Sequence, residues 1–154
     1  MKINLSEIKI EKMNLSHIKA IALLEKECFS EPWSEQSLKA ELKNVNAHFF
    51  VAQNKGKILG YIGAHCYSGE CYISNVAVFR EYQNQKIGSM LLKNFIEFIK
   101  DKCEFISLEV RKSNLLVIKL YENFGFKKVG VRKDFYKKPS EDALIYTLFF
   151  DNEN

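Results

Sequence analysis

The sequence lacks any apolar stretch long enough to cross a bilayer as a helix, which takes about 18 or more consecutive apolar residues. Its N-terminal segment, MKINLSEIKIEK, also lacks the apolar core of a signal peptide. Internal repeats, low-complexity tracts and linkers are absent, and both prolines, Pro32 and Pro139, fall in predicted loops. These absences exclude a membrane-spanning helix, and we expect a cytoplasmic globular protein with no membrane partner.

A metal-ligand pattern is missing as well. His17, His48 and His65 are scattered and form no ligand spacing with the four cysteines, so we expect no metal. In a cytosol the cysteines should be reduced. Cys66 and Cys71 are nevertheless predicted to face each other across a two-residue turn, near disulfide distance, and the sequence leaves open whether they bond.

Length and charge set wide limits. The 154 residues suffice for a real core, and we expect a single domain over residues 1–154. The formal net charge of +4 permits an acidic ligand or a neighbouring RNA but requires neither. We therefore expect no direct nucleic-acid binding, and a monomer or weak dimer.

Residues 74–92, SNVAVFREYQNQKIGSMLL, carry the strongest local signal. A buried strand ends at Val78, a polar connection follows, and apolar residues then recur at helical spacing from Ile87. The first turn of a helix offers unpaired backbone N–H groups and a positive dipole end, which suit phosphate. Gly88 would let a ligand approach the backbone. The segment could equally be an ordinary loop before a helix.

Apolar periodicity predicts the element order β-α-α-β-β-β-α-β-α-β-β. Hairpins combined with strand–helix crossovers indicate a mixed sheet with helices on its faces, an α/β fold. Residues 133–142 are expected to form a basic, aromatic loop between the last two strands. The expected strands cover residues 8–13, 48–52, 58–67, 70–78, 104–110, 126–132 and 143–150, and the helices lie near residues 18–29, 35–42, 87–101 and 116–124.

Two of the predicted strands, ending at Val78 and Val110, each lead into a helix. If they lie side by side and their ends separate, a cleft opens where α/β sheets usually hold ligands. Glu109 would lie at its mouth, and Asn114 and Tyr121 would share one face of the following helix. Each also has a structural reading: Glu109 as a solvated edge residue, Tyr121 as core, and Asn114 as an N-cap.

The helix-opening loop, Gln83 to Gly88, resembles the acyl-CoA-binding motif Arg/Gln-x-x-Gly-x-Gly/Ala of the GNAT N-acetyltransferases, with Lys86 in place of the middle glycine. The element order resembles that fold along essentially the whole chain. A closer resemblance, to the bacterial ribosomal-protein alanine N-acetyltransferases (RimI-like), is carried by CFSEPWS at 28–34, LEVRKSN at 108–114, LYENFGF at 120–126, and the tail Arg132, Tyr136 and Glu141-Asp142-Ala143.

The resemblance implies that acetyl-CoA donates an acetyl group to an amine. Glu109 would take the proton of the amine, directly or through one water, and Tyr121 would protonate the departing thiolate. Asn114 would contact the pantetheine arm. The backbone of Val76, Ala77 and Val78 would hold the thioester carbonyl, and the pyrophosphate would lie on Gln83, Asn84, Gln85, Lys86, Ile87, Gly88 and Ser89.

The closer resemblance implies that the acceptor is a protein N-terminus, in particular the N-terminal alanine of a small-subunit ribosomal protein. Trp33 and Tyr136 would form walls of its site, on the side opposite CoA. Two alternatives stay open: acetylation of lysine side chains or small amines, and a non-catalytic acyl-CoA-binding module, which the departure at Lys86 would favour.

Overall fold

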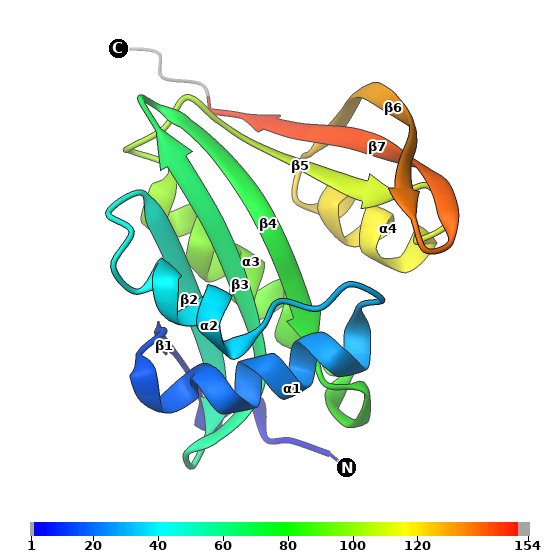
Figure 1. Cartoon of the computed structure of the whole chain (residues 1–154). Helices are drawn as coiled ribbons and strands as arrows, with labels where there is room; N and C mark the ends of the chain where they lie inside the picture. The colour runs from blue at the N-terminus through cyan, green and yellow to red at the C-terminus, as the bar shows by residue number, and fades with distance from the viewer. Residues whose placement is uncertain (1, 151–154) are drawn as a thin grey trace.

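The computed structural model describes residues 2–150, which build one continuous seven-stranded sheet flanked by helices (Figure 1). The strands are β1 (Ile8–Lys12), β2 (Ala47–Asn54), β3 (Lys57–Tyr67), β4 (Glu70–Val78), β5 (Phe105–Arg111), β6 (Lys127–Lys137) and β7 (Ser140–Phe149). The helices are α1 (Ile18–Cys28), α2 (Glu35–Glu41), α3 (Ile87–Ile99) and α4 (Leu115–Asn123), with short 3₁₀ turns at Leu5–Glu7, Leu15–His17 and Arg80–Tyr82. The predicted element order is confirmed.

The strands lie in the order β1-β2-β3-β4-β5-β7-β6. β4 and β5 run parallel, whereas the other neighbouring pairs are antiparallel. This mixed sheet confirms the predicted α/β class. No helix within residues 2–150 is long and apolar enough to span a membrane.

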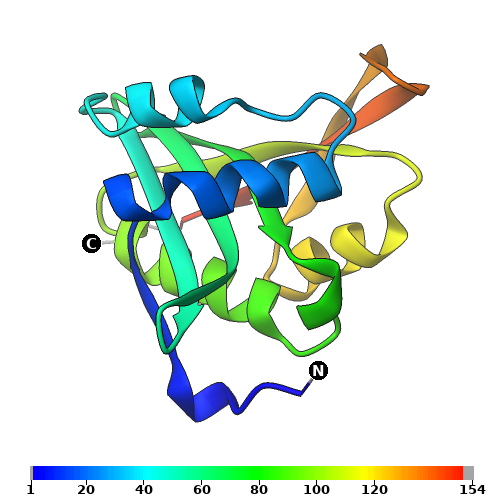
Figure 2. The ribbon, with the colours of Figure 1, turned by 60° about the horizontal axis from the view of Figure 1, so that its bottom comes forward.

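Helices cover both faces of the sheet, with α1 and α2 on one side and α3 and α4 on the other (Figures 1 and 2). β2 shows why both layers are needed. Phe49 and Val51 pack in the core beneath α1, while Phe50 and Ala52 pack in the core that includes α3. Alternate side chains of a strand point to opposite faces, so a strand buried on both sides is apolar throughout.

The parallel pairing of β4 and β5 is short. It runs from Glu70 opposite Phe105 to Ile73 opposite Leu108 and then stops. At the next position, Ser74, β4 carries an extra residue relative to β3. A bulge of this kind bends a strand and increases its twist. The two strands therefore separate beyond Ile73, which meets the condition stated for a cleft between them.

The expectation of a loop over residues 133–142 is wrong. β6 continues to Lys137 and β7 begins at Ser140, and the two strands pair up to a tight turn at the cis Lys138–Pro139 bond. The pairing slips between Arg132 and Tyr136, where the Asp134 N–H donates to Asp142 Oδ1 at 2.9 Å. The irregularity masks the strand pattern, because an unpaired stretch breaks the alternation by which a strand is recognised.

Lys86 adopts the backbone conformation that glycine favours. Its φ is 68° and its ψ 13°, at the residue that precedes the first turn of α3. Left-handed backbone costs an L-residue about 1–2 kcal/mol, whereas glycine adopts it freely. Lys86 thus occupies a backbone conformation that a glycine would adopt without strain.

Substituting Lys86→Gly should relieve this backbone strain and raise the free energy of unfolding by about 0.5–1 kcal/mol. Urea denaturation measures the change. Lys93→Gly, in the exposed interior of α3, is the matched control and should lower stability by about 1 kcal/mol. If both variants lose stability alike, the left-handed turn at Lys86 is not strained.

Candidate functional site

A cleft of about 560 Å³ opens where β4 and β5 separate. Six of the residues singled out from the sequence line it: Trp33, Val76, Glu109, Asn114, Tyr121 and Tyr136. They come from the α1–α2 segment, β4, β5, α4 and β6. The fold thus brings together side chains that are far apart along the chain.

Glu109 belongs to the exposed edge of this cleft. Its side chain is 32% exposed, and its Oε2 lies 2.9 Å from the Nε of Arg132. Arg132, on β6, also lines the cleft. The sequence did not predict its contact with Glu109. β6 is separated from β5 by β7 in the sheet, and this strand order cannot be read from the local sequence pattern.

Tyr121 combines a core ring with a place in the cleft. The residue is 4% exposed, and its ring centroid lies 5.4 Å from that of Phe126. Burial, and secondarily Tyr136, raises the pKa of the Tyr121 hydroxyl above its ordinary value. The phenol therefore stays protonated at neutral pH, as a proton donor must. The structural and the functional readings of Tyr121 are compatible.

Asn114 has the structural role that its sequence position predicts. Its Oδ1 accepts a hydrogen bond from the Val117 N–H at 3.4 Å and caps α4. The side-chain amide NH₂ is the remaining donor group, in a residue that lines the cleft.

The helix-opening loop lies outside the lining of this cleft. The Gln83 amide donates to the Val78 carbonyl at 3.0 Å, and Gln85 Oε1 accepts from the Ile3 N–H at 2.7 Å, so both side chains hold the loop in place. At Gly88 a Cβ would meet only Leu120 and Val78, at 3.7 and 4.0 Å. Protein packing therefore does not require glycine there. What the loop can offer a ligand is its backbone, at the start of α3.

A buried carboxylate, Glu25 of α1, connects three segments around the cleft. It is fully buried and accepts three hydrogen bonds: from the backbone N–H of Trp33 at 2.9 Å, from the Tyr61 hydroxyl at 2.6 Å and from the side-chain amide of Asn75 at 3.2 Å. Asn75 also donates to the Tyr61 oxygen at 3.1 Å. This network holds Trp33 against α1 and against β4 just beyond the bulge.

The sequence contained a signal for Glu25 that was missed. It stands four residues after Ile21 and next to Leu24, on the buried stripe of α1. A charged residue on such a stripe requires buried partners. Two of its three donors, Tyr61 and Asn75, come from distant strands, so the carboxylate could have been flagged from sequence but these partners could not.

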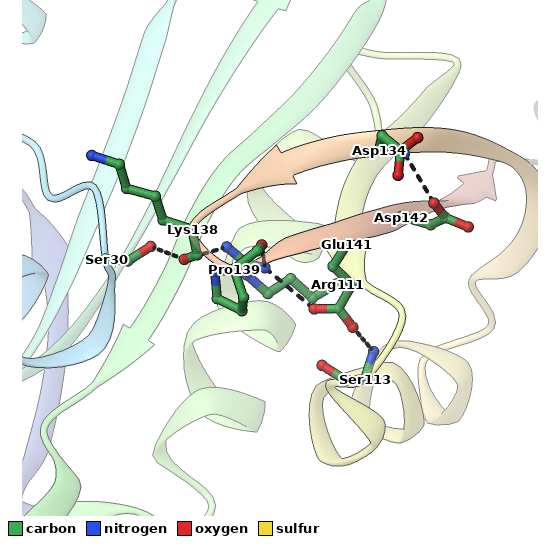
Figure 3. A network of polar contacts seen from close by, with 8 residues as sticks. All are labelled: Ser30, Arg111, Ser113, Asp134, Lys138, Pro139, Glu141 and Asp142. Carbon is green, nitrogen blue, oxygen red and sulfur yellow. Dashed lines mark hydrogen bonds and ion pairs between the residues drawn. The ribbon is translucent and has the colours of Figure 1, made fainter.

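The tip of the β6–β7 hairpin is fastened to the rest of the protein through Arg111 (Figure 3). The guanidinium donates to the carbonyls of Lys138 and Pro139 at 3.1 and 2.9 Å and contacts Glu141 at 3.2 Å. The Ser30 hydroxyl donates to the same Lys138 carbonyl at 2.6 Å. The hairpin therefore meets the α1–α2 segment at the cleft.

The same guanidinium positions Tyr136, because Arg111 Cζ lies 4.2 Å from the centroid of the tyrosine ring. Glu141 completes the arrangement by accepting from the Ser113 N–H at 2.6 Å. Hydrogen bonding to Ser113, followed by the contacts with Arg111, lowers the pKa of the Glu141 carboxyl. Tyr136 is thus held as one wall of the cleft.

Comparison with known proteins gives consistent matches. Residues 18–126 match the GNAT family of acetyltransferases. A Bacillus subtilis (strain 168) protein, provisionally named a ribosomal protein bS18-alanine N-acetyltransferase, is 36% identical over 138 residues, which cover 88% of this chain and 91% of that protein.

Solved structures agree. The ribosomal-protein-S18-alanine N-acetyltransferase from Escherichia coli aligns with a TM-score of 0.88 at 27% identity, covering 96% of each chain. A GNAT family acetyltransferase from Elizabethkingia anophelis, solved with acetyl-CoA bound, has the same fold, with a TM-score of 0.74 at 22% identity, covering 93% of this chain and 98% of that one.

The buried position of Glu25 predicts a specific pH dependence of stability. Burial raises its pKa above the ordinary 4.5, despite the hydrogen bonds from Tyr61 and Trp33. A raised carboxyl pKa gives a stabilising contribution that is complete below the unfolded-state value and is lost as pH rises through the folded-state value.

Glu25→Gln cannot ionise, so its unfolding free energy should lack this decline in the pH range above the ordinary carboxyl pKa of 4.5. Urea denaturation across that range measures it. Glu31→Gln, exposed on the neighbouring segment, should retain the decline. A Glu25→Gln curve parallel to that of the unmodified protein would contradict the prediction.

Proposed function

This chain belongs to the GNAT acetyltransferase family, and from that premise we propose that it transfers acetyl from acetyl-CoA to the α-amino group of a protein N-terminus. The candidate acceptor is the N-terminal alanine of ribosomal protein bS18, after the names of the Bacillus subtilis and Escherichia coli relatives. The observation that carries the proposal is that Glu109 and Tyr121 line one cleft at the point where β4 and β5 separate.

The chemistry requires proton transfers at the acceptor nitrogen and at the departing sulfur. An α-ammonium has no lone pair, so the acceptor must lose a proton before its nitrogen attacks the thioester carbonyl. Glu109 is the group that accepts it, directly or through one water. The tetrahedral intermediate then collapses as the C–S bond breaks, the thiolate of CoA takes a proton from the Tyr121 hydroxyl, and the second proton that the nitrogen loses on becoming an amide restores the tyrosine. The backbone of Val76 to Val78 supports the carbonyl oxygen.

Arg132 adds a step before the chemistry. Its guanidinium is paired with Glu109 through Oε2. An incoming α-ammonium competes with Arg132 for that carboxylate, and displacing the guanidinium frees Oε2 for the amine. Because Arg132 has a side chain that is 59% exposed, it can move into water without leaving a buried charge behind.

The two ends of acetyl-CoA bind to different parts of the site. We assign the pyrophosphate to the backbone N–H groups between Asn84 and Ser89, where α3 begins. The pantetheine arm contacts Asn114. Because Lys86 holds a left-handed turn that a glycine would adopt without strain, the departure at this position does not support a non-catalytic module.

The acceptor side is formed by Trp33 and Tyr136, each held by a polar network. Glu25 fixes the main chain of Trp33 through its backbone N–H, and the Trp33 ring lies 5.9 Å from that of Phe49 between centroids. The Tyr136 ring lies against Arg111. Fixed aromatic walls bind a peptide end without losing rotamer freedom of their own. Both are on the side of the cleft where the α1–α2 segment meets the hairpin.

The direct test is release of free CoA thiol from acetyl-CoA with three acceptors. One is a peptide with the N-terminal sequence of bS18, the second is the same peptide with a blocked N-terminus and an internal lysine, and the third is a polyamine. Turnover with the first alone is expected. Turnover with only the second or third would replace the α-amine acceptor, and no turnover with any amine would contradict the enzyme assignment.

Removing either member of the proposed acid–base pair should slow the reaction. Glu109→Gln and Tyr121→Phe keep the shape of each side chain and are each expected to lower kcat by about 10²- to 10⁴-fold. The KM for acetyl-CoA should change little. Glu109→Gln should also regain activity as pH rises, since water then deprotonates more of the amine. Undiminished turnover in either variant would remove that residue from its role.

Arg132→Gln should lower the KM for the acceptor, by about two- to fivefold, because the amine no longer competes with a guanidinium for Glu109. The KM for acetyl-CoA should stay the same. Lys133→Gln removes the same charge from the neighbouring position on the hairpin and is the matched control. Equal effects of the two variants would mean that overall charge, rather than the pair, is responsible.

A further inference from the structure

Three of the four cysteines meet at the end of the sheet where β3 turns into β4. Cys66 lies near the end of β3, Cys71 near the start of β4, and Cys103 in the connection before β5. Their three Sγ atoms all lie within 4.8 Å of one another, and those of Cys66 and Cys71 are 2.8 Å apart. All are free thiols, and the site proposed above uses none of them.

The backbone sets the first pair in register. Ser68 and Gly69 form the turn, with φ of 49° and 85°, and Cys66 pairs directly with Cys71. The backbone N–H of Cys66 points away from β4 and donates to the Asn46 carbonyl at 2.9 Å. It therefore makes no hydrogen bond to Cys71, and the two cysteines form a non-hydrogen-bonded pair. Non-hydrogen-bonded antiparallel pairs bring side chains closer than hydrogen-bonded ones. The approach of the two thiols therefore follows from the strand pairing.

The third thiol is brought in by a separate contact. The Glu104 N–H donates to the Gly69 carbonyl at 2.7 Å and ties the α3–β5 connection to the hairpin turn. Cys103 precedes that anchor directly. The sequence did not reveal the group, because residue 103 reaches the hairpin only through this long-range contact.

Access differs among the three. Cys71 and Cys103 are buried in the apolar core with Ile99 and Ile106, whereas Cys66 is partly exposed. The hydrogen bond between the two opposed thiols lowers the pKa of Cys66 and, together with burial, raises that of Cys71. Burial raises the pKa of Cys103 to about 11. Cys66 is thus the most accessible of the three and the one most readily ionised.

We propose that Cys66 and Cys71 are an oxidation site that forms a reversible cross-strand disulfide with a peroxide as oxidant. The Cys66 thiolate attacks a peroxide oxygen, so that an S–O bond forms, the O–O bond breaks and the departing hydroxide takes up a proton. Cys71 then attacks the Cys66 sulfur; the S–S bond forms, the S–O bond breaks, and water leaves with the Cys71 proton. Two thiols lose two electrons, and hydrogen peroxide becomes two waters.

A metal site on the same thiols is the competing reading. Zn–S bonds of about 2.3 Å place three ligand sulfurs about 4 Å apart, well beyond the 2.8 Å of the closest pair. Three thiolates around a divalent ion would also leave a net negative charge in an apolar core. A disulfide is neutral, so burial does not oppose it. Both arguments favour the disulfide.

Tryptic mapping tests the proposal on the full, unmodified chain. Cys66 and Cys71 lie on one peptide, residues 58–80, whereas Cys103 lies on residues 103–111 and Cys28 on residues 27–39. After treatment with hydrogen peroxide and alkylation under denaturing conditions, peptide 58–80 should be two hydrogens lighter and unalkylated. Cys28 and Cys103 should be alkylated, and dithiothreitol should restore both lost thiols.

Variants identify the partners. Cys66→Ala and Cys71→Ala should abolish the two-hydrogen loss, while Cys103→Ala should retain it. A cross-link between peptides 58–80 and 103–111, or four alkylated thiols after oxidation, would overturn the proposal. So would protection of all three thiols by added Zn²⁺ in a protein that peroxide leaves unchanged, since that result would assign the cluster to a metal.

Discussion

The short parallel ladder between β4 and β5 is the constraint on which the rest of the site depends. Only four residue pairs join these strands, from Glu70 to Ile73 on one side. β4 then remains paired with β3 and β5 with β7, so the sheet stays whole while a gap opens in its middle. Backbone groups at such a gap need other partners, and an amide-containing ligand arm can supply them.

The bulge at Ser74 keeps this gap open from the β3 side. The Ser74 hydroxyl lies 2.9 Å from His65 Nδ1, and His65 Nε2 lies 2.6 Å from a carboxylate oxygen of Glu41 at the end of α2. One residue later, Asn75 is held by Glu25 of α1. The bulge is thus tied to both helices of one face. An opening in a sheet that is fixed in this way is a feature of the fold and does not require a ligand to create it.

Local pattern predicted those elements whose burial is complete. The alternation from Phe49 to Ala52 and the helical spacing of Leu91 and Phe95 have one physical solution, since each strand or helix must bury its apolar face. It predicted both strands of the β6–β7 hairpin but failed at residues 133–142, where β6 is largely exposed. There the hairpin is held by contacts with residues distant in the sequence, such as the hydrogen bonds from Arg111 to the carbonyls of Lys138 and Pro139. The local sequence pattern gives no sign of these contacts.

The site divides in the same way. Sequence placed Glu109, Asn114 and Tyr121 near one another because each follows from a single strand–helix unit. It could not place Arg132 beside Glu109, since their contact crosses from β6 to β5 past β7. Long-range contacts depend on strand order, which hydrophobic periodicity does not encode. The resemblance to a known family supplied the candidate chemistry of the site but not this pair.

The basicity of the acceptor bears on which amine Glu109 can deprotonate. At pH 7 about a tenth of an α-amine with a pKa near 8 is already unprotonated, whereas for a lysine amine with a pKa near 10.4 the fraction is about 1 in 2,500. A base in the cleft therefore has to remove a proton from nearly every lysine amine that enters, and from a smaller share of α-amines. The α-amine makes the smaller demand on Glu109. The lower pKa of an α-amine therefore favours a chain terminus over a lysine side chain as acceptor, independently of the names of the relatives.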